Sequence, residues 1–221
     1  MLIDHIGKLF FPDVAFLAIV GRLAFPLFAF FIAEGVFYTR SIKKYLCKLL
    51  IFGLISQIPY ILFFYPLIRI NVLFTFIFAI LLILLINKIR ATDNKVDKGF
   101  LIFFAVAYTL IIALLGYCSF IEYGVFGMLL PVCFYFFRHK IVLKYVSFVA
   151  LMVGYVGSNI LISWSIEFGH FIQLFALLAI VLIALYNDRK DESSNKLKYL
   201  FYVFYPLHLA LLVLIKFILG V

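Results

Sequence analysis

Residues 16–38 read FLAIVGRLAFPLFAFFIAEGVFY, an almost unbroken apolar run that carries two charged side chains, Arg22 and Glu34. A run of about 20 apolar residues is long enough to cross a bilayer as a helix. A charge inside the bilayer costs several kcal/mol, about 2.5–3.5 for arginine on insertion scales, unless it faces a partner or a wet cavity. The stretch therefore predicts a membrane-spanning helix that contributes to a functional polar site.

The composition of the whole chain agrees with this interpretation. Of its 221 residues, 67% are apolar and 13% are charged, and the mean hydropathy is +1.22. Soluble domains carry roughly 25% charged residues. The apolar runs are uniform and do not alternate, which favours helices over a closed strand barrel. We expect one integral membrane domain over residues 1–221.

The apolar runs predict an all-α fold, a polytopic transmembrane bundle of about nine helices. Residues 1–11, which precede Pro12, are too few to cross the bilayer at about 1.5 Å per residue. They predict a short, half-inserted first helix, or a native start that lies further upstream. The remaining spans are expected at 16–38, 45–65, 71–87, 99–118, 123–137, 141–158, 168–186 and 199–219.

Basic residues predict the orientation. Of the 19 lysines and arginines, 15 fall in four connections that alternate along the chain. Because basic loops stay on the cytoplasmic side, we expect these four inside and the C-terminus outside. The net charge of +9 then reflects orientation and lipid contact, which excludes nucleic acid as a partner. The four groups are Arg40, Lys43, Lys44 and Lys48; Lys88, Arg90, Lys95 and Lys98; Arg138, Lys140 and Lys144; Arg189, Lys190, Lys196 and Lys198.

Several kinds of site are missing from the sequence. The cysteines Cys47, Cys118 and Cys133 are scattered in or next to apolar runs and have no pairing or ligand spacing, so we interpret them as packing residues. There is no metal-ligand pattern, no phosphate-binding loop and no nucleophilic serine elbow, and we expect no metal.

Polar residues in the outer half of the predicted spans suggest a shared cavity. Histidine with a nearby carboxylate acts as a general base, and a buried arginine suits a phosphate, a carboxylate or a developing oxyanion. These groups fit acyl transfer in a membrane cavity, and they equally fit a proton-coupled transporter. The residues expected to line the cavity are Asp4, His5, Arg22, Gln57, Asn71 and His208, with Glu34 near the cytoplasmic end of its helix.

Each of these residues also has a purely structural interpretation. Asp4 and His5 suit the start of a helix, and Arg22 suits a structural ion pair. Glu34 is a poor partner for Arg22, because twelve residues separate them by roughly 18 Å along one helix. His208 is able to satisfy a backbone carbonyl freed by the proline before it. The other two histidines, His139 and His170, are expected at the surface.

Five motifs, in order along the chain, resemble the TraX family of membrane proteins. They are DHIGKLFFPD at 4–13, GRLAFPLFAFFIAEG at 21–35, NVLFTF at 71–76, YGVFGMLLP at 123–131 and KYLFYVFYPLHLALL at 198–212. The resemblance implies a membrane acetyltransferase that uses cytosolic acetyl-CoA, since the family includes a protein that acetylates the N-terminal amine of a conjugative pilin. Family members usually carry a longer apolar segment before the first motif.

The resemblance implies a role for each of these polar residues. His5 is the base, oriented by Asp4; Arg22 holds the acceptor or the oxyanion; His208 is a second acid or base. Acetyl-CoA enters from the cytoplasm, and an amine or hydroxyl of a membrane protein, peptide or glycan approaches from outside. A transporter or flippase, and a non-catalytic assembly factor, remain alternatives. The expected binding residues are Glu34, Gln57 and Asn71 for substrate and Arg40, Lys43 and Lys44 for the phosphates of acetyl-CoA.

Overall fold

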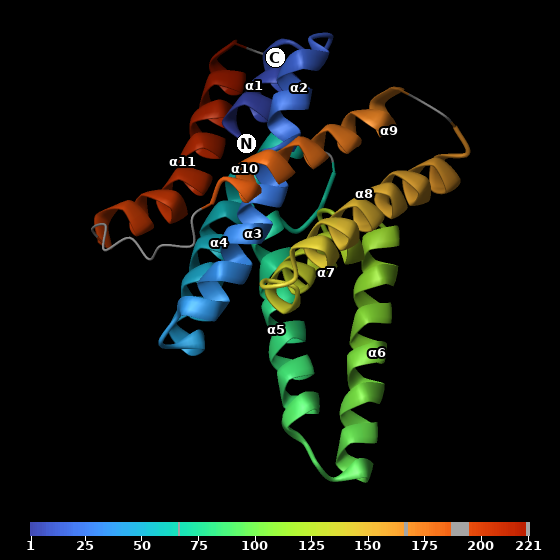
Figure 1. The fold of residues 1–221 in the computed structure, drawn as a ribbon. Helices are drawn as coiled ribbons and strands as arrows, with labels where there is room; N and C mark the ends of the chain where they lie inside the picture. The colour runs from blue at the N-terminus through green and yellow to red at the C-terminus, as the bar shows by residue number, and fades with distance from the viewer. Residues whose placement is uncertain (66, 166–167, 187–194, 220–221) are drawn as a thin grey trace.

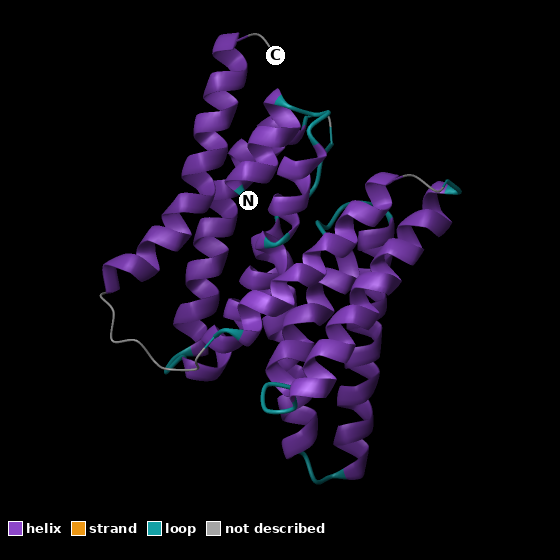
Figure 2. Cartoon of the chain, turned by 45° about the horizontal axis from the view of Figure 1, so that its top comes forward, coloured by secondary structure: helices purple, strands orange, loops and turns teal. Residues whose placement is uncertain are grey.

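The structure is a computed structural model that describes residues 1–65, 67–165, 168–186 and 195–219. Within these ranges the chain is helical apart from its turns and loops and one backbone bridge between Ile70 and Ile121 (Figure 2). This confirms the predicted all-α fold with a short first helix. The elements are α1 (Leu2–Phe10), α2 (Ala15–Arg22), α3 (Ala24–Tyr38), α4 (Ile42–Phe64), α5 (Val72–Ala91), α6 (Lys95–Tyr117), α7 (Gly124–Phe136), α8 (Ile141–Ser163), α9 (Phe168–Ile172), the 3₁₀ helix η1 (Gln173–Leu178), α10 (Ala179–Ala184) and α11 (Asn195–Leu219).

The longer helices have the length and composition of membrane spans, so the chain is a multi-pass membrane protein. Two shorter apolar helices, Gly124–Phe136 and Gly169–Ala184, accompany them. Among the described residues, six stretches qualify as candidate spans: Ala15–Tyr38, Ile42–Phe64, Val72–Ala91, Lys95–Tyr117, Ile141–Ser163 and Tyr202–Leu219.

Proline and capping side chains explain where the observed helices differ from the predicted spans. The span at 16–38 is interrupted at Leu23, because Pro26 has no backbone hydrogen to donate to the carbonyl of Arg22 four residues earlier. Helix α4 begins before its apolar run, at a cap in which the Ser41 side chain accepts from the amide of Lys44. Asn94 caps α6 in the same way.

The centre of the bundle is made by α3, α5 and α7, which contact one another. Helix α4 packs on α5 and α11, α8 packs on α7, and α6 lies at the edge against α5 and α7 (Figure 1). Large apolar side chains along α6 are exposed, as expected of a helix that is hydrophobic all round and faces lipid. The largest fully buried side chains include Phe76, Met128 and Phe134.

The first and last helices of the chain, α1 and α11, contact each other. Helix α1 packs against α2 and α11. The α3–α4 turn and the α5–α6 turn lie at the opposite end from α1 (Figure 1). Two of the four basic connections therefore share an end, away from α1. The predicted basic residues Arg189 and Lys190, and the C-terminal Val221, lie outside the described residues.

Candidate functional site

Two buried histidines from opposite ends of the chain face each other. His5 Nδ1 of α1 lies 3.1 Å from His208 Nε2 of α11, and the two residues are 5% and 3% exposed. On the other side of its ring, His208 Nδ1 lies 2.8 Å from the backbone carbonyl oxygen of Phe204, one turn earlier. The His5 ring also makes edge contacts with the rings of Phe63 and Phe64. The histidine pair therefore lies where α1, α4 and α11 meet.

The hydrogen bonds of this pair determine which nitrogen carries each proton. A carbonyl oxygen accepts and never donates, so the contact with Phe204 requires a hydrogen on His208 Nδ1. Neutral His208 then has its lone pair on Nε2, which accepts the hydrogen of His5 Nδ1. The other nitrogen of His5, Nε2, is left without a hydrogen. His5 is thus set up as a base at Nε2.

Burial keeps His5 uncharged. Helix α1 lies outside the candidate spans, and removal from water lowers the pKa of His5 below its ordinary value. The neighbouring charge of Lys8 acts in the same direction. At neutral pH the His5 ring is therefore neutral, the form in which Nε2 accepts a proton.

Asp4 is the centre of a compact ion cluster beside the histidine pair. Its carboxylate lies 2.6 Å from Lys8 Nζ and 3.0 Å from Arg22 Nη2. Burial alone would raise the pKa of Asp4, but Lys8 and Arg22 hold it below its ordinary value. Gly21 permits this arrangement, because a Cβ atom there would collide with the Asp4 side chain. The expected orientation of His5 by Asp4 is not seen: His208 contacts the His5 ring, and Asp4 contacts the two cations.

Gln57 and Asn71 form a separate network that holds a loop. Gln57 Nε2 donates to the Arg69 carbonyl at 2.6 Å, and its Oε1 accepts from Asn71 Nδ2 at 2.8 Å. Asn71 also donates to the Gly53 carbonyl and caps α5 through the amide of Leu73. These two residues satisfy backbone groups, so the structure places them as supports of the loop before α5.

The loop before α5 carries Arg69, and a second loop that contacts it carries Glu122. Neither residue is predicted as part of the site from the sequence. The amide of Ile70 donates to the Phe120 carbonyl at 2.9 Å, which joins the loop carrying Arg69 to the loop carrying Glu122. The Glu122 carboxylate is hydrogen-bonded by the Tyr60 side chain. Burial raises the pKa of Glu122 above its ordinary value, against the opposing effect of Lys8.

Four charged residues in this part of the structure each have a buried side-chain atom that lacks a hydrogen-bond partner. Within the described part of the chain, the buried side-chain atoms without a hydrogen-bond partner are Asp4 Oδ1, Arg22 Nε, Arg69 Nε and Glu122 Oε2. For Asp4 Oδ1, the contact with Arg22 is close enough for an ion pair but lacks hydrogen-bond geometry. Buried polar atoms are normally paired, so each of these four atoms is able to bind a polar ligand or a water molecule.

Glu34 lies in a different part of the structure. Its two carboxylate oxygens accept from Arg138 Nε and Nη2, each at 2.8 Å, and the Tyr38 hydroxyl lies 2.6 Å from the same Nη2. The guanidinium also lies over the Phe37 ring, 4.0 Å from its centroid. This bidentate pair joins α3 to the turn after α7 and gives Glu34 a structural partner. Glu34 is therefore not among the residues that surround His5.

The residues expected to bind acetyl-CoA are far from the histidine pair along α4. Arg40, Lys43 and Lys44 are exposed at the α3–α4 turn. Lys43 and Phe63 lie at opposite ends of α4, about 30 Å apart along the helix axis. Phe63 contacts His5, so the expected donor phosphates and the expected base are separated by most of the membrane thickness.

Comparisons with known proteins agree with the motifs. Over 124 residues the chain is 34% identical to a probable fimbrial assembly protein, FimC of serogroup H1, from Dichelobacter nodosus; the match covers 49% of this chain and 50% of that protein. Over 162 residues it is 26% identical to a protein described as uncharacterized from Rickettsia prowazekii (strain Madrid E), covering 72% of this chain and 60% of the relative.

The chain thus spans about half the length of the first relative and somewhat more of the second. No solved structure matches it. A family model described as TraX protein matches residues 1–216, nearly the whole chain. The chain belongs to the TraX family.

Proposed function

We propose that this protein is an integral membrane acetyltransferase that moves the acetyl group of acetyl-CoA to an amine or hydroxyl acceptor. The observation that carries the proposal is the buried histidine pair, in which the Phe204 carbonyl and His208 leave His5 Nε2 as a base. Membership of the TraX family, which is associated with pilin acetylation, supports it. One relative is named as a probable fimbrial assembly protein, which agrees with an exported protein as acceptor.

The proposed reaction uses the site as follows. His5 Nε2 removes a proton from the acceptor as its nitrogen or oxygen attacks the acetyl carbonyl carbon. Arg22, held by Asp4, stabilises the negative charge that develops on the carbonyl oxygen. The carbon–sulfur bond breaks, and the thiolate of CoA takes the proton from His5. His208 orients the His5 ring and shares the positive charge that His5 gains.

The proposed donor site is the basic turn with Arg40, Lys43 and Lys44, which suits the phosphates of acetyl-CoA at the cytoplasmic face. The basic connections are proposed to be cytoplasmic and α1 to lie towards the outer face. Because this turn lies about 30 Å from Phe63 along α4, the donor is proposed to bind first at the turn and then to move along the bundle until its thioester reaches His5. CoA should raise the melting temperature of the purified protein, because a ligand of the folded state stabilises it.

The test is acetyl-CoA turnover by the full chain in lipid nanodiscs with membrane extract as acceptor. We expect transfer of labelled acetyl groups by the wild type and a loss of about 10²–10⁴-fold in His5→Gln. The matched control is His139→Gln, which alters an exposed histidine and should leave the rate unchanged. A wild type that consumes no acetyl-CoA would refute the proposal and favour a transporter or an assembly factor.

A further inference from the structure

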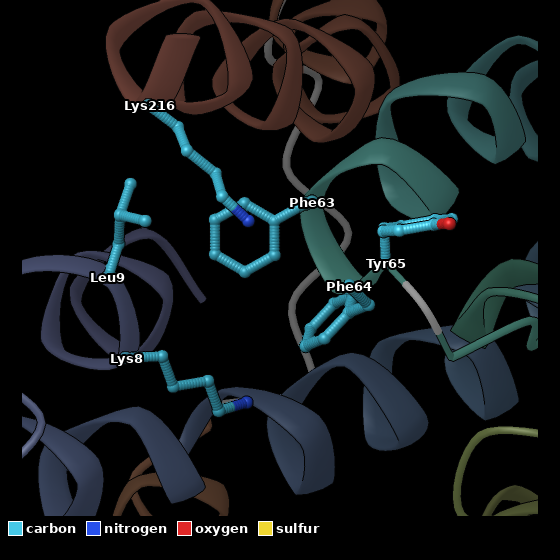
Figure 3. A pocket seen from close by; sticks show the side chains of 6 residues that line it. All are labelled: Lys8, Leu9, Phe63, Phe64, Tyr65 and Lys216. Atoms are coloured by element: carbon cyan, nitrogen blue, oxygen red, sulfur yellow. The ribbon is translucent and has the colours of Figure 1, made fainter. Parts of the chain in front are cut away.

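A pocket of about 250 Å³ opens beside α1, α4 and α11, next to the histidine pair. Lys8 and Lys216 extend into it from opposite sides, and the rings of Phe63 and Phe64 lie between them (Figure 3). Leu9 and Tyr65 complete its lining. The pocket thus combines two ammonium groups with an aromatic wall.

The two lysines follow the two histidines on the same helices. Lys8 comes three residues after His5 on α1, about 4.5 Å along the axis, and Lys216 comes eight residues after His208 on α11, about 12 Å. Both spacings keep the side chains near one face of a helix. Phe63 connects the two places directly, because its ring touches the His5 ring and also lines the pocket.

The pocket has an excess of positive charge. Lys8 and Arg22 share the single carboxylate of Asp4, so this trio keeps a positive charge. Among the described residues, no carboxylate lies within ion-pair distance of Lys216. Lys8 remains 38% exposed, which leaves donors for a ligand. Together with Lys216 the excess is two positive charges, which a monoanion between the two lysines would halve and a phosphate dianion would neutralise.

We propose that the pocket binds an anionic group, phosphate or carboxylate, of the acetyl acceptor. The apolar part of the acceptor packs on Phe63 and Phe64, and its amine or hydroxyl, a few bonds from the anion, reaches His5. This inference rests on the proposed acetyltransferase function and adds the chemical class of the acceptor. The anion belongs either to a lipid headgroup or to an acceptor that is not a lipid, such as an exported protein, and both present the same chemistry to the two lysines.

Binding of two probes to the purified full chain tests the pocket without any acetyl-CoA. The lipid probe is phosphatidylglycerol, measured by native mass spectrometry against phosphatidylcholine. The soluble probe is inorganic phosphate, measured by thermal shift and by competition with the lipid. We expect the variant Lys8→Gln/Lys216→Gln to bind the effective probe at least about tenfold more weakly, since it loses two charge-assisted contacts.

Matched variants separate binding from folding. Lys95→Gln/Lys98→Gln removes the same charge from α6 and should leave binding unchanged, and Lys8→Arg/Lys216→Arg should retain it. Lys216→Gln alone, which leaves the Asp4–Lys8 contact intact, should weaken binding about threefold or more even if the double variant does not fold.

The results of these binding experiments identify the source of the anion or refute the proposal. Lysine-dependent binding of phosphatidylglycerol without competition by phosphate indicates a lipid headgroup, and competition by phosphate indicates a soluble anion. Binding that is unchanged in the lysine variants overturns the proposal, as does CoA if it competes at these two lysines, because the pocket would then hold the donor. A wild type that binds the anion through the two lysines but consumes no acetyl-CoA would refute the acetyltransferase function alone. The pocket would then remain an anion-binding site without an assigned acceptor.

Discussion

The substitution His208→Leu tests whether His208 works by orienting His5. Leucine cannot accept the hydrogen of His5 Nδ1, and the two residues are 5% and 3% exposed, so water has little access to replace it. An unpaired buried donor costs about 1–3 kcal/mol. Because His5 becomes charged as it takes the proton of the acceptor, the missing contact costs more in the transition state than in the ground state. At about 1.4 kcal/mol per factor of ten, a difference of this size should lower the rate of acetyl transfer roughly 5- to 150-fold.

His208→Gln is the matched variant. The glutamine side chain offers a carbonyl oxygen at a reach similar to that of Nε2, so His5 Nδ1 again has an acceptor. We expect most of the lost rate to return, to within about tenfold of the wild type. His5→Gln should not be rescued in this way, because it removes the base itself.

Initial rates with labelled acetyl-CoA, measured at several concentrations, provide the assay. The His208 variants should lower kcat and leave the KM for acetyl-CoA nearly unchanged, because the contact acts on the base. Circular dichroism and size-exclusion profiles check folding. The reasoning fails if His208→Gln is as slow as His208→Leu, or if His208→Leu keeps the rate of the wild type.

Four further predictions concern packing, charge and orientation. Gly21→Ala should cost about 1–3 kcal/mol and lower turnover, because its methyl group would push Asp4 away; melting and turnover measurements that match the wild type would contradict the close approach. Glu34→Gln should destabilise the fold by about 3–5 kcal/mol in denaturant titrations, since it leaves Arg138 buried without its carboxylate; a change below about 1 kcal/mol would show that the pair adds little. Arg22→Lys should lower kcat, because lysine lacks the planar fork of arginine, and an unchanged kcat would reduce Arg22 to a plain charge. A cysteine at position 93, between α5 and α6, should resist an impermeant thiol reagent in intact cells, and its labelling from outside would overturn the proposed orientation.

The helices were predictable because uniform apolar runs of this length have few alternatives in a membrane. Their exact limits were less so. Ser41 and Asn94 start helices before the apolar residues begin, and the segment at 168–186 divides into α9, η1 and α10 although its composition is uniform. Hydropathy records burial in lipid, and it carries little information about caps or about 3₁₀ turns.

The sequence predicts which residues form the candidate site better than it predicts the contacts among them. Depth along the helices grouped Asp4, His5, Arg22 and His208, and the structure brings these four together. Adjacent helical residues point about 100° apart, so the carboxylate of Asp4 faces the cations while His5 faces α11. Pairing between residues 203 positions apart depends on tertiary packing that a single sequence does not display.

Two further differences between the predicted site and the structure concern loop residues and a long-range ion pair. Arg69 and Glu122 are not predicted as site residues, because each is a lone charge in a connection between spans. The only sequence signal for them was their opposite charge on connections expected at the same face. Glu34 was grouped with the substrate-binding residues because its partner, Arg138, is 104 positions away, and its helix offers no cation at an adjacent turn.

The pairing of the two chain ends has a consequence for biosynthesis. His208 is synthesised 203 residues after His5. At about 5–20 residues per second, roughly 10–40 s separate the two during membrane insertion. Until α11 arrives, the His5 ring has no acceptor for its Nδ1 hydrogen from that helix. A nascent chain that stalls before its last helix therefore carries His5 without the histidine that contacts its ring.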